Sequence, residues 1–322
     1  MVWIDKPVLV HVGLHKTATS WLQDFYFPFT KNGFWVPPVD SSIRRPIKQI
    51  GHWFVGDEFG RLLDKSEFSS SKIRSALSNL DCPAGLMPVI SNERLAGHPL
   101  SNGFDRVVIA QRIKEVFPQA RILLTIREQN KIIMSNYMQY LRYGGWHEPE
   151  HFVHPLSDGR QPVLSLNFWN YNDLAGTYAK IFSKERVLVL PQEMLRSNVG
   201  DFVSRLAQFA SVIPPVSINN LVEANPRRMH VSSYLLRRYS FLIMRSSANA
   251  FMPTVVPDRL GARIYRALRF IIDQVTPGFI EERVAKSLQK RVDAKIGDFY
   301  LVSNRRLANS VSFDLASLGY RL

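Results

Sequence analysis

Residues 7–23, PVLVHVGLHKTATSWLQ, place a lysine and several hydroxyl groups directly after a short apolar run. Residues 8–12 are rich in β-branched side chains and predict a buried strand, while apolar residues at helical spacing resume at residue 21. A loop between a strand and a helix presents backbone N–H groups at the positive end of a helix dipole, which favours a bound anion. The loop adds one cation and three hydroxyl donors that would strengthen such a site, namely Lys16, Thr17, Thr19 and Ser20.

The glycine spacing of this loop excludes two common nucleotide-binding motifs. A Walker A motif needs G-x-x-x-x-G-K-[ST], but counting from Gly13 puts Ala18 at the second glycine and Thr19 at the lysine. The G-x-G-x-x-G pattern of dinucleotide-binding folds is absent as well. A P-loop kinase for a nucleotide or a small molecule is kept as an alternative only because of the pair Lys16-Thr17.

The chain is long, ordinary in hydrophobicity and strongly basic. Its 322 residues are 46% hydrophobic and carry a formal net charge of +14, which is typical of a globular protein with a sizeable core. Much of the charge lies in residues 225–322, which hold seventeen Lys and Arg against seven Asp and Glu. We therefore expect an acidic partner: a nucleic acid, phospholipid headgroups, an anionic glycan or a polyanionic cofactor.

Cysteine content and hydropathy indicate the compartment. The single cysteine, Cys82, excludes an internal disulfide framework and is typical of a reducing compartment. It precedes Pro83 and has no histidine or basic residue close in sequence to activate it, so we do not expect it to be catalytic. No signal peptide is visible, and no uncharged apolar run approaches the ~18 residues that span a bilayer. We expect a cytoplasmic protein, either soluble or at the inner face of the membrane.

Strands and helices alternate along the first two thirds of the chain. Short apolar runs bounded by turn residues predict strands at 8–12, 86–91, 121–126 and 186–190, and residues 33–38 form a short extended piece stopped by Pro37 and Pro38. Apolar residues at helical spacing predict helices at about 17–30, 69–80, 104–117, 127–143, 167–182 and 201–210. This alternation implies parallel pairing through right-handed crossovers, and so an α/β fold with a central sheet flanked by helices.

Beyond residue 214 the strand pattern stops and the chain becomes helical and basic. In residues 259–273, RLGARIYRALRFIID, apolar side chains form one stripe and four arginines lie off it. This helix either packs on the core with a solvated charged face or lies on an anionic membrane surface. We predict a single domain over residues 1–322, with an α/β core at about 6–212 and a basic helical region at about 213–322.

The loop sequence HVGLHKTATSWLQ resembles the 5′-phosphosulfate-binding loop of sulfotransferases that use 3′-phosphoadenosine 5′-phosphosulfate (PAPS), whose pattern is approximately P-K-[ST]-G-T-[TS]-W-L. It is particularly similar to the bacterial, carbohydrate-type branch of that superfamily. His15 replaces the usual proline and Ala18 the usual glycine, and an alanine with an ordinary φ is expected to be tolerated at a helix start. The positions that match in order are Lys16, Thr17, Thr19, Ser20 and Trp21.

A second motif lies more than a hundred residues later. In these sulfotransferases an Arg at the end of a strand and a Ser eight residues on, in the following helix, bind the 3′-phosphate. Here Arg127 follows the predicted strand 121–126, and Ser135 lies in the predicted helix 127–143. A guanidinium fork matches a phosphate bidentately, and a nearby hydroxyl adds a donor. The resemblance therefore implies that the two motifs hold opposite ends of PAPS.

The resemblance implies a P-loop NTPase-like three-layer fold and transfer of a sulfuryl group from PAPS to a hydroxyl, with no metal ion. Residues 15–21 would contact the donor, with Lys16 as a catalytic residue on the oxygen between sulfate and phosphate. Trp21 would either offer a face to the adenine or pack into the core. Such a transfer needs in-line positioning and neutralisation of the charge on departing 3′,5′-ADP more than covalent chemistry.

An acceptor hydroxyl must also lose its proton, which requires a base within about 3 Å of it. Glu93 follows the predicted strand 86–91 at the carboxyl edge of the sheet, where parallel α/β folds bind ligands. We assign Glu93 as this base, against a structural role as an N-cap partner or in a salt bridge to Arg94. His52 and His98 are the competing bases.

The basic charge also bears on the acceptor. It favours a glycan or glycolipid over a small phenol or alcohol, and residues 40–81, which match no motif, are a candidate source of specificity. Arg227 and Arg228 would close over the 3′-phosphate or lie in solvent. A non-catalytic protein that binds anions or nucleic acid is a second alternative, but no aromatic stripe accompanies the charge, so we expect no nucleic-acid partner.

Overall fold

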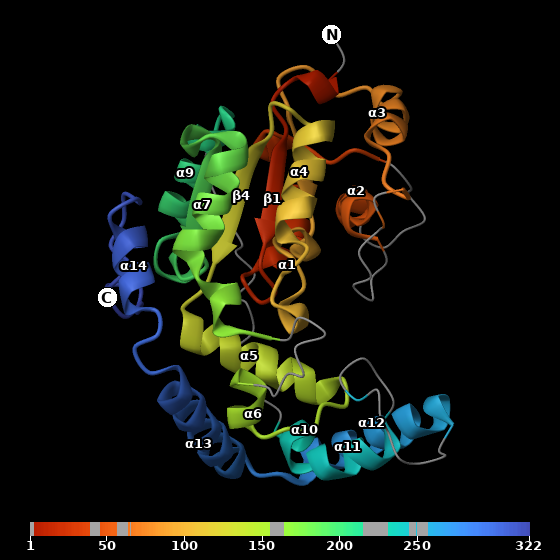
Figure 1. Cartoon of the computed structure of the whole chain (residues 1–322), viewed down its shortest axis with the longest axis vertical. Helices are drawn as coiled ribbons and strands as arrows, with labels where there is room; N and C mark the ends of the chain where they lie inside the picture. The colour runs from red at the N-terminus through yellow and green to blue at the C-terminus, as the bar shows by residue number, and fades with distance from the viewer. Residues whose placement is uncertain are drawn as a thin grey trace. The chain divides into compact units, whose positions relative to one another are not determined.

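The computed structural model describes residues 3–38, 46–56, 64, 66–154, 164–214, 231–244, 249 and 257–322. The chain divides into two compact units (Figure 1). The first unit comprises Met1–Glu128, Gly159–Asn219 and Tyr300–Leu322. The second unit comprises Gln129–Asp158 and Asn220–Phe299. The end of the chain thus belongs to the first unit, so the basic region predicted from residue 213 onward is divided between the two.

The first unit is built on a five-stranded sheet whose strands all run parallel, in the order β2-β3-β1-β4-β5. Its strands are β1 (Leu9–Gly13), β2 (Phe34–Trp35), β3 (Met87–Ser91), β4 (Arg121–Ile126) and β5 (Val187–Pro191). Central β1 is buried throughout, as expected of a parallel strand covered on both faces. The predicted α/β fold class is confirmed.

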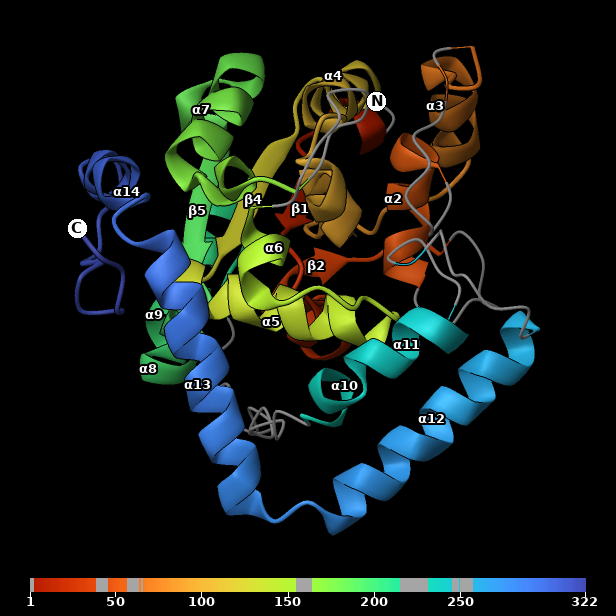
Figure 2. The same cartoon turned by 60° about the horizontal axis from the view of Figure 1, so that its bottom comes forward.

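Helices cover both faces of this sheet (Figure 2). Leu9, Val89 and Leu123 face one side, where they share a core cluster with Tyr26 and Phe202. The larger helices of the first unit are α2 (Pro46–Val55), α3 (Ser70–Ser78), α4 (Arg106–Val116), α7 (Tyr171–Phe182), α9 (Val199–Ala210) and α14 (Leu301–Ala308). Its short helices are η1 (Trp3–Asp5), α1 (Thr19–Trp21), η2 (Leu22–Tyr26), η3 (Thr30–Asn32), η4 (Glu93–Ala96), η5 (Pro99–Ser101), η6 (Leu166–Trp169), η7 (Lys184–Arg186) and α8 (Met194–Ser197).

The strands predicted at 8–12, 86–91, 121–126 and 186–190 are confirmed, whereas the extended piece at 33–38 contains only the two-residue strand β2. The helices predicted at 69–80, 104–117 and 201–210 are confirmed. The helix predicted at 167–182 is α7 preceded by the short η6, and α2 was not predicted. The helix expected at about 17–30 begins at Thr19 as α1, continues as the π-helix η2 and ends at Tyr26. The backbone of residues 14–18 is instead a loop. The helix therefore starts only after the lysine and the first hydroxyl residue, which leaves both of them in the loop.

The second unit is helical in its described residues. It consists of α5 (Gln129–Arg142), α6 (Pro149–Val153), α10 (Ser232–Leu235), α11 (Arg237–Ile243), α12 (Asp258–Val275) and α13 (Gly278–Ile296). Ion pairs join these helices: Arg237 binds Glu148, and Arg291 Nη2 lies 2.6 Å from Glu150 Oε2. No helix within the described ranges is both long and apolar enough to cross a bilayer.

A buried polar network ties three strands of the first unit to the loop after β1. His11 is fully buried, with Nδ1 2.7 Å from Ser91 Oγ and Nε2 2.9 Å from Thr125 Oγ1. Thr125 Oγ1 is 2.8 Å from Thr17 Oγ1, and the Thr17 hydroxyl donates to the Leu14 carbonyl at 2.7 Å. A neutral imidazole has one donor and one acceptor, which the two flanking hydroxyls satisfy. The network therefore holds the loop against the sheet through the hydrogen bond between Thr17 and Thr125.

Burial keeps His11 neutral. It lowers the pKa of His11 to about 3, although the nearby carboxylate of Glu93 opposes the shift. Burial likewise lowers the pKa of His15 to about 4. An unfolded chain protonates both histidines near their ordinary pKa of about 6.5, whereas the folded protein does so only at much lower pH. Stability is therefore predicted to fall as the pH drops below about 6.5.

We expect His11→Gln to reduce this acid sensitivity. A buried neutral histidine contributes a slope of about 1.4 kcal/mol per pH unit between its unfolded and folded pKa values. Because burial also lowers the pKa values of His15, His98 and His147, which contribute to the same slope, the variant should lose only part of it. The measurement is the urea-unfolding midpoint at intervals from pH 7.5 to 5. The matched control is His151→Gln, which changes an exposed histidine; equal slopes for His11→Gln and the wild type would contradict the role given to His11.

Candidate active site

Polar and charged side chains follow the carboxyl ends of four neighbouring strands, and those after three of the strands were predicted as site residues. The loop with Lys16 follows β1, Glu93 follows β3, Arg127 follows β4 and Glu193 follows β5. In the sheet these strands lie in the order β3-β1-β4-β5. This edge is where parallel α/β sheets bind ligands. Lys16, Glu93 and Arg127 thus follow neighbouring strands at one edge of the sheet, and their roles in binding and catalysis stay predictions.

The loop backbone takes an unusual conformation. Lys16 has φ 71° and Ala18 has φ 61°, so two left-handed residues flank Thr17. The expectation that Ala18 has an ordinary φ is wrong: the Thr17 side chain is held inward by the network, and the chain reverses hand on either side of it. Such residues cost on the order of 1 kcal/mol each, and they concentrate at functional sites. Alternating hand is also typical of backbone nests, which direct successive N–H groups at an anion.

The hydroxyl side chains of the loop point in different directions. Thr17 and Thr19 are buried, and Thr19 Oγ1 lies 3.4 Å from the Leu14 carbonyl oxygen. Ser20 is exposed. Ala18, at the N-cap of α1, makes no side-chain capping bond, so it leaves the first N–H groups of the helix uncapped by its side chain. The loop thus offers an anion its backbone and Ser20, while Thr17 anchors the loop.

Gly13 permits this tight arrangement. A Cβ atom at Gly13 would lie 2.5 Å from Thr19 Oγ1 and 2.8 Å from His11 Nε2. Both contacts are shorter than real Cβ atoms make. Glycine is therefore required at the end of β1 for reasons of space, not of backbone hand.

Trp21 stacks on Tyr26, with ring centroids 5.6 Å apart and planes 19° apart. Its side chain is half-buried and packs against the core cluster of the first unit. The alternative of core packing thus accounts for one face of the ring. Contact between the other face of the Trp21 ring and an adenine stays a prediction.

Arg127 reaches from the end of β4 to the loop. Its Nη1 lies 3.4 Å from the Lys16 carbonyl oxygen, and its own carbonyl accepts a 2.6 Å hydrogen bond from the buried Tyr171 hydroxyl. Burial lowers the pKa of Arg127, which the nearby Glu193 carboxylate opposes, so the guanidinium stays charged at neutral pH. Ser135 is half-buried in α5 of the second unit. Its pairing with Arg127 on one phosphate stays a prediction.

Glu193 is a site residue that the sequence analysis missed. Its Oε1 accepts a 3.0 Å hydrogen bond from the Glu128 backbone N–H, and its Oε2 accepts one from the Tyr320 hydroxyl at 3.3 Å. Tyr320 is buried near the end of the chain, so the last residues support this edge directly. The sequence holds one indication of this role, a carboxylate two positions after β5.

Glu93 is paired with Lys48, which the sequence analysis also missed. Lys48 Nζ lies 2.5 Å from Glu93 Oε1, while Arg94 forms its ion pair with Asp105 at 2.7 Å. The alternative that Glu93 pairs with Arg94 is therefore wrong. Burial raises the pKa of Glu93, but the opposite effect of the Lys48 charge and hydrogen bond is part of a larger lowering, so that the pKa is about 2. Glu93 is thus ionised, and its Oε2 is buried with no hydrogen-bond partner among the described residues.

Close packing of α2 brings Lys48 to Glu93. Asn92, the N-cap of η4, donates from Nδ2 to the Lys48 carbonyl at 3.0 Å and accepts from the Arg94 N–H at 2.8 Å. A Cβ atom at Gly51 would lie 2.3 Å from Asn92 Cβ, so only glycine allows this approach. No motif marks α2, because its contribution depends on tertiary packing. Part of the unassigned segment 40–81 therefore belongs to the site.

The candidate histidines differ in their positions. His15 is half-buried next to Glu93, whose charge opposes the lowering of the His15 pKa by burial, and its Nδ1 is buried with no hydrogen-bond partner among the described residues. His98 also acts on His15 electrostatically, and burial lowers the pKa of His98. His52 lies one helical turn after Lys48 in α2. The structure therefore groups Glu93, Lys48 and His15 most closely.

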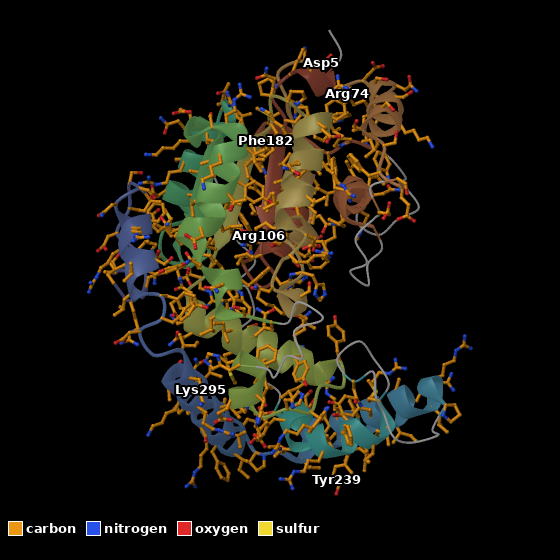
Figure 3. All side chains as sticks on the ribbon, viewed as in Figure 1. Asp5, Arg74, Arg106, Phe182, Tyr239 and Lys295 are labelled. Carbon is orange, nitrogen blue, oxygen red and sulfur yellow. The ribbon has the colours of Figure 1, made fainter. Side chains whose placement is uncertain are left out.

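Arg106, which is labelled in Figure 3, supports the segment that carries Glu93 by bonding to Ala96. Its Nε donates to the Ala96 carbonyl at 3.0 Å and its Nη2 to the Phe168 carbonyl at 3.0 Å. The guanidinium carbon lies 4.8 Å from the centroid of the Phe168 ring. These contacts join the end of η4 to η6 and hold Glu93 on a rigid support.

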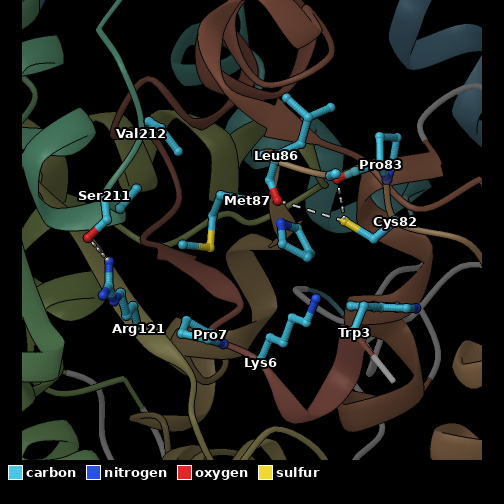
Figure 4. A pocket seen from close by; sticks show the side chains of 14 residues that line it. Trp3, Lys6, Pro7, Cys82, Pro83, Leu86, Met87, Arg121, Ser211 and Val212 are labelled. Carbon is cyan, nitrogen blue, oxygen red and sulfur yellow. Dashed lines mark hydrogen bonds between the residues drawn. The ribbon is translucent and has the colours of Figure 1, made fainter. Parts of the chain in front are cut away.

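Other candidate features lie away from this edge. A cavity of about 240 Å³ at the amino ends of the strands is lined by Lys6, Cys82 and Arg121, among others (Figure 4). Burial raises the pKa of the Cys82 thiol, which does not favour a nucleophile. Across the described ranges, no group of three or more His, Cys, Asp or Glu side chains is placed to hold a metal ion. Arg227 and Arg228 lie outside the described residues.

Solved structures that resemble this chain at low similarity include two sulfotransferases. No family model matches it, and no curated protein matches it. A sulfotransferase from Alicyclobacillus acidocaldarius is similar over 73% of this chain and 93% of its own, at 16% identity and a TM-score of 0.44. A sulfotransferase domain from the curacin biosynthetic pathway is similar over 91% of this chain and 98% of its own, at 13% identity and a TM-score of 0.38. Because both scores are low, the functional assignment depends on the residues of this chain.

The left-handed conformation of Ala18 predicts that Ala18→Gly stabilises the protein. Relief of the αL strain outweighs the added freedom of the unfolded chain, for a gain of roughly 0.5–1 kcal/mol in the free energy of unfolding. The matched control is Ala175→Gly in the interior of α7, which should lose about 1 kcal/mol. Urea unfolding at pH 7.5 measures both. If Ala18→Gly destabilises as Ala175→Gly does, Ala18 is not left-handed in solution.

Proposed function

We propose that this protein is a PAPS-dependent sulfotransferase that transfers a sulfuryl group to a hydroxyl of a carbohydrate or glycolipid. The observation that carries the proposal is the contact between the two motifs at one sheet edge, where Arg127 Nη1 lies 3.4 Å from the Lys16 carbonyl oxygen. Three neighbouring strands are each followed by a charged group. These groups are the Lys16 loop with its alternating backbone hand, the cation of Arg127 and the ionised carboxylate of Glu93. This set suits a doubly anionic donor and an acceptor that must lose a proton.

Donor binding is assigned to the loop and to Arg127. The backbone N–H groups of residues 15–21 and the exposed Ser20 would hold the 5′-phosphosulfate, and Lys16 would lie on the oxygen between sulfur and phosphorus. Arg127 and Ser135 would bind the 3′-phosphate. The S–O bond to the phosphate breaks as the acceptor oxygen bonds to sulfur, and Lys16 neutralises the charge left on 3′,5′-ADP.

Proton removal is assigned to Glu93. Lys48 binds Oε1 and holds the carboxylate ionised, while Oε2 is buried without a hydrogen-bond partner among the described residues, so acceptor binding would have to uncover Oε2 before it could take the acceptor proton. A carboxylate with a pKa of about 2 is a weak base in the resting protein. Its role is to accept the proton late, when the acceptor oxygen has already bonded to sulfur and its proton has become acidic. Lys48 is a positioning residue in this scheme.

The acceptor class follows from charge and location. A net charge of +14 favours an anionic or membrane-linked sugar as acceptor, and the described part of segment 40–81 contributes Lys48 beside the base. We propose a cytoplasmic location for this activity. A P-loop kinase and a non-catalytic anion-binding protein are the alternatives that the following experiment separates.

Calorimetry with 3′,5′-ADP and with Mg²⁺-ATP tests the donor assignment. The wild type should prefer 3′,5′-ADP, and Lys16→Ala should weaken its binding. Arg127→Ala should weaken 3′,5′-ADP by about 10- to 100-fold, the value of a charged bidentate pair, and leave 5′-AMP nearly unchanged because it lacks the 3′-phosphate. Preference for Mg²⁺-ATP would favour the kinase, and equal losses for both ligands would contradict the role of Arg127.

The matched control is Glu93→Gln. It should keep the affinity for 3′,5′-ADP, since Glu93 is assigned to the acceptor, but should lose turnover of PAPS with glycan and glycolipid acceptors. Wild-type turnover by this variant would remove Glu93 as the base. Binding of 3′,5′-ADP with no turnover by any variant or by the wild type would favour the non-catalytic alternative.

A further inference from the structure

Helix α12 of the second unit carries an exposed apolar stripe. Five large apolar side chains recur at intervals of three or four residues and are 36–69% exposed: Leu260, Ile264, Leu268, Ile271 and Val275. Residues at this spacing lie on one face of a helix. A stripe of this kind on a globular protein marks a surface that binds something apolar.

The stripe is not the face by which α12 packs in its own unit. Tyr265 is buried, and its hydroxyl donates to the Leu141 carbonyl at 2.9 Å. Gly261, one turn earlier on the same side, is also buried. α12 thus has separate faces for internal packing and for the exposed stripe. Polar changes in the stripe should leave the fold intact.

A third face of the same helix is strongly basic. Its four arginines follow at intervals of three or four residues, and all except the half-buried Arg269 are exposed: Arg259, Arg263, Arg266 and Arg269. Phe279 at the start of α13, the helix that follows α12 in the chain, is 73% exposed. Tyr239 on the adjacent α11 is exposed as well (Figure 3). Exposed aromatic residues beside an apolar stripe are typical of the water–lipid boundary.

We propose that α12 lies flat on an anionic phospholipid bilayer. The apolar stripe would enter the boundary of the acyl chains, and the arginines would contact lipid phosphates. Charge favours this occupant: a second copy would bring its own arginines against those of α12, whereas anionic headgroups complement them. This inference concerns a surface of the second unit and does not depend on the proposed sulfotransferase activity.

Co-sedimentation of the full-length protein with vesicles tests this proposal. The protein should bind vesicles of phosphatidylcholine with phosphatidylglycerol and bind much less to phosphatidylcholine alone, and 0.5 M NaCl should weaken the binding. Ile264→Gln with Leu268→Gln, and separately Arg259→Glu with Arg263→Glu, should each lower the partition coefficient at least about tenfold. Circular dichroism establishes that each variant keeps its helical content.

The control is Val302→Gln in α14, a change of an exposed apolar residue in the first unit that is more exposed than Ile264 and Leu268, and this variant should bind as the wild type does. The proposal would be overturned if the wild type bound neutral and anionic vesicles equally or bound neither. It would also be overturned if both α12 double variants bound anionic vesicles as well as the wild type does. A monomer–dimer equilibrium that the Ile264→Gln and Leu268→Gln changes abolish, without vesicle binding, would assign the stripe to a second copy instead. Failure of 3′,5′-ADP binding would leave this result unaffected.

Discussion

The hydrogen bond between the hydroxyls of Thr125 and Thr17 is the interaction on which the candidate site depends most. It connects the loop after β1 to a neutral, fully buried His11 that also bonds to β3 through Ser91. Because Thr17 is held inward, Lys16 and Ala18 adopt positive φ on either side of it. The anion-binding shape of the loop is thus a consequence of the sheet interior, and its strain is balanced by a satisfied polar network.

Charges along the sheet edge are arranged in compensated pairs. Arg127 has Glu193 nearby, and Glu93 has Lys48. In each pair, one residue is proposed to contact a substrate, namely Arg127 or Glu93. The other residue, Glu193 or Lys48, holds that side chain in position. The positioning charges come from α2 and from the segment after β5, and Tyr320 supports Glu193 from the end of the chain. Distant parts of the sequence therefore meet at this edge to hold a few groups in place.

The α/β fold and the positions of Lys16, Glu93 and Arg127 at one sheet edge could be predicted from the sequence because local pattern determines them. The apolar runs of β1, β3, β4 and β5 and the position of Arg127 after β4 are of this kind. Ala18 was predicted wrongly, because its hand depends on where the Thr17 side chain bonds. Lys48 could not be predicted, since it reaches Glu93 through the contact of Gly51 with Asn92. His11 was missed because a single histidine in an apolar strand has no motif.

A crystal structure of the protein with 3′,5′-ADP tests the central claim most directly. We predict the 5′-phosphate on the backbone N–H groups of the loop between β1 and α1, and the 3′-phosphate within hydrogen-bond distance of Arg127. Density for the ligand in the cavity lined by Lys6 and Arg121, at the amino ends of the strands, would contradict the account. A loop left without ligand at saturating concentration would contradict it equally.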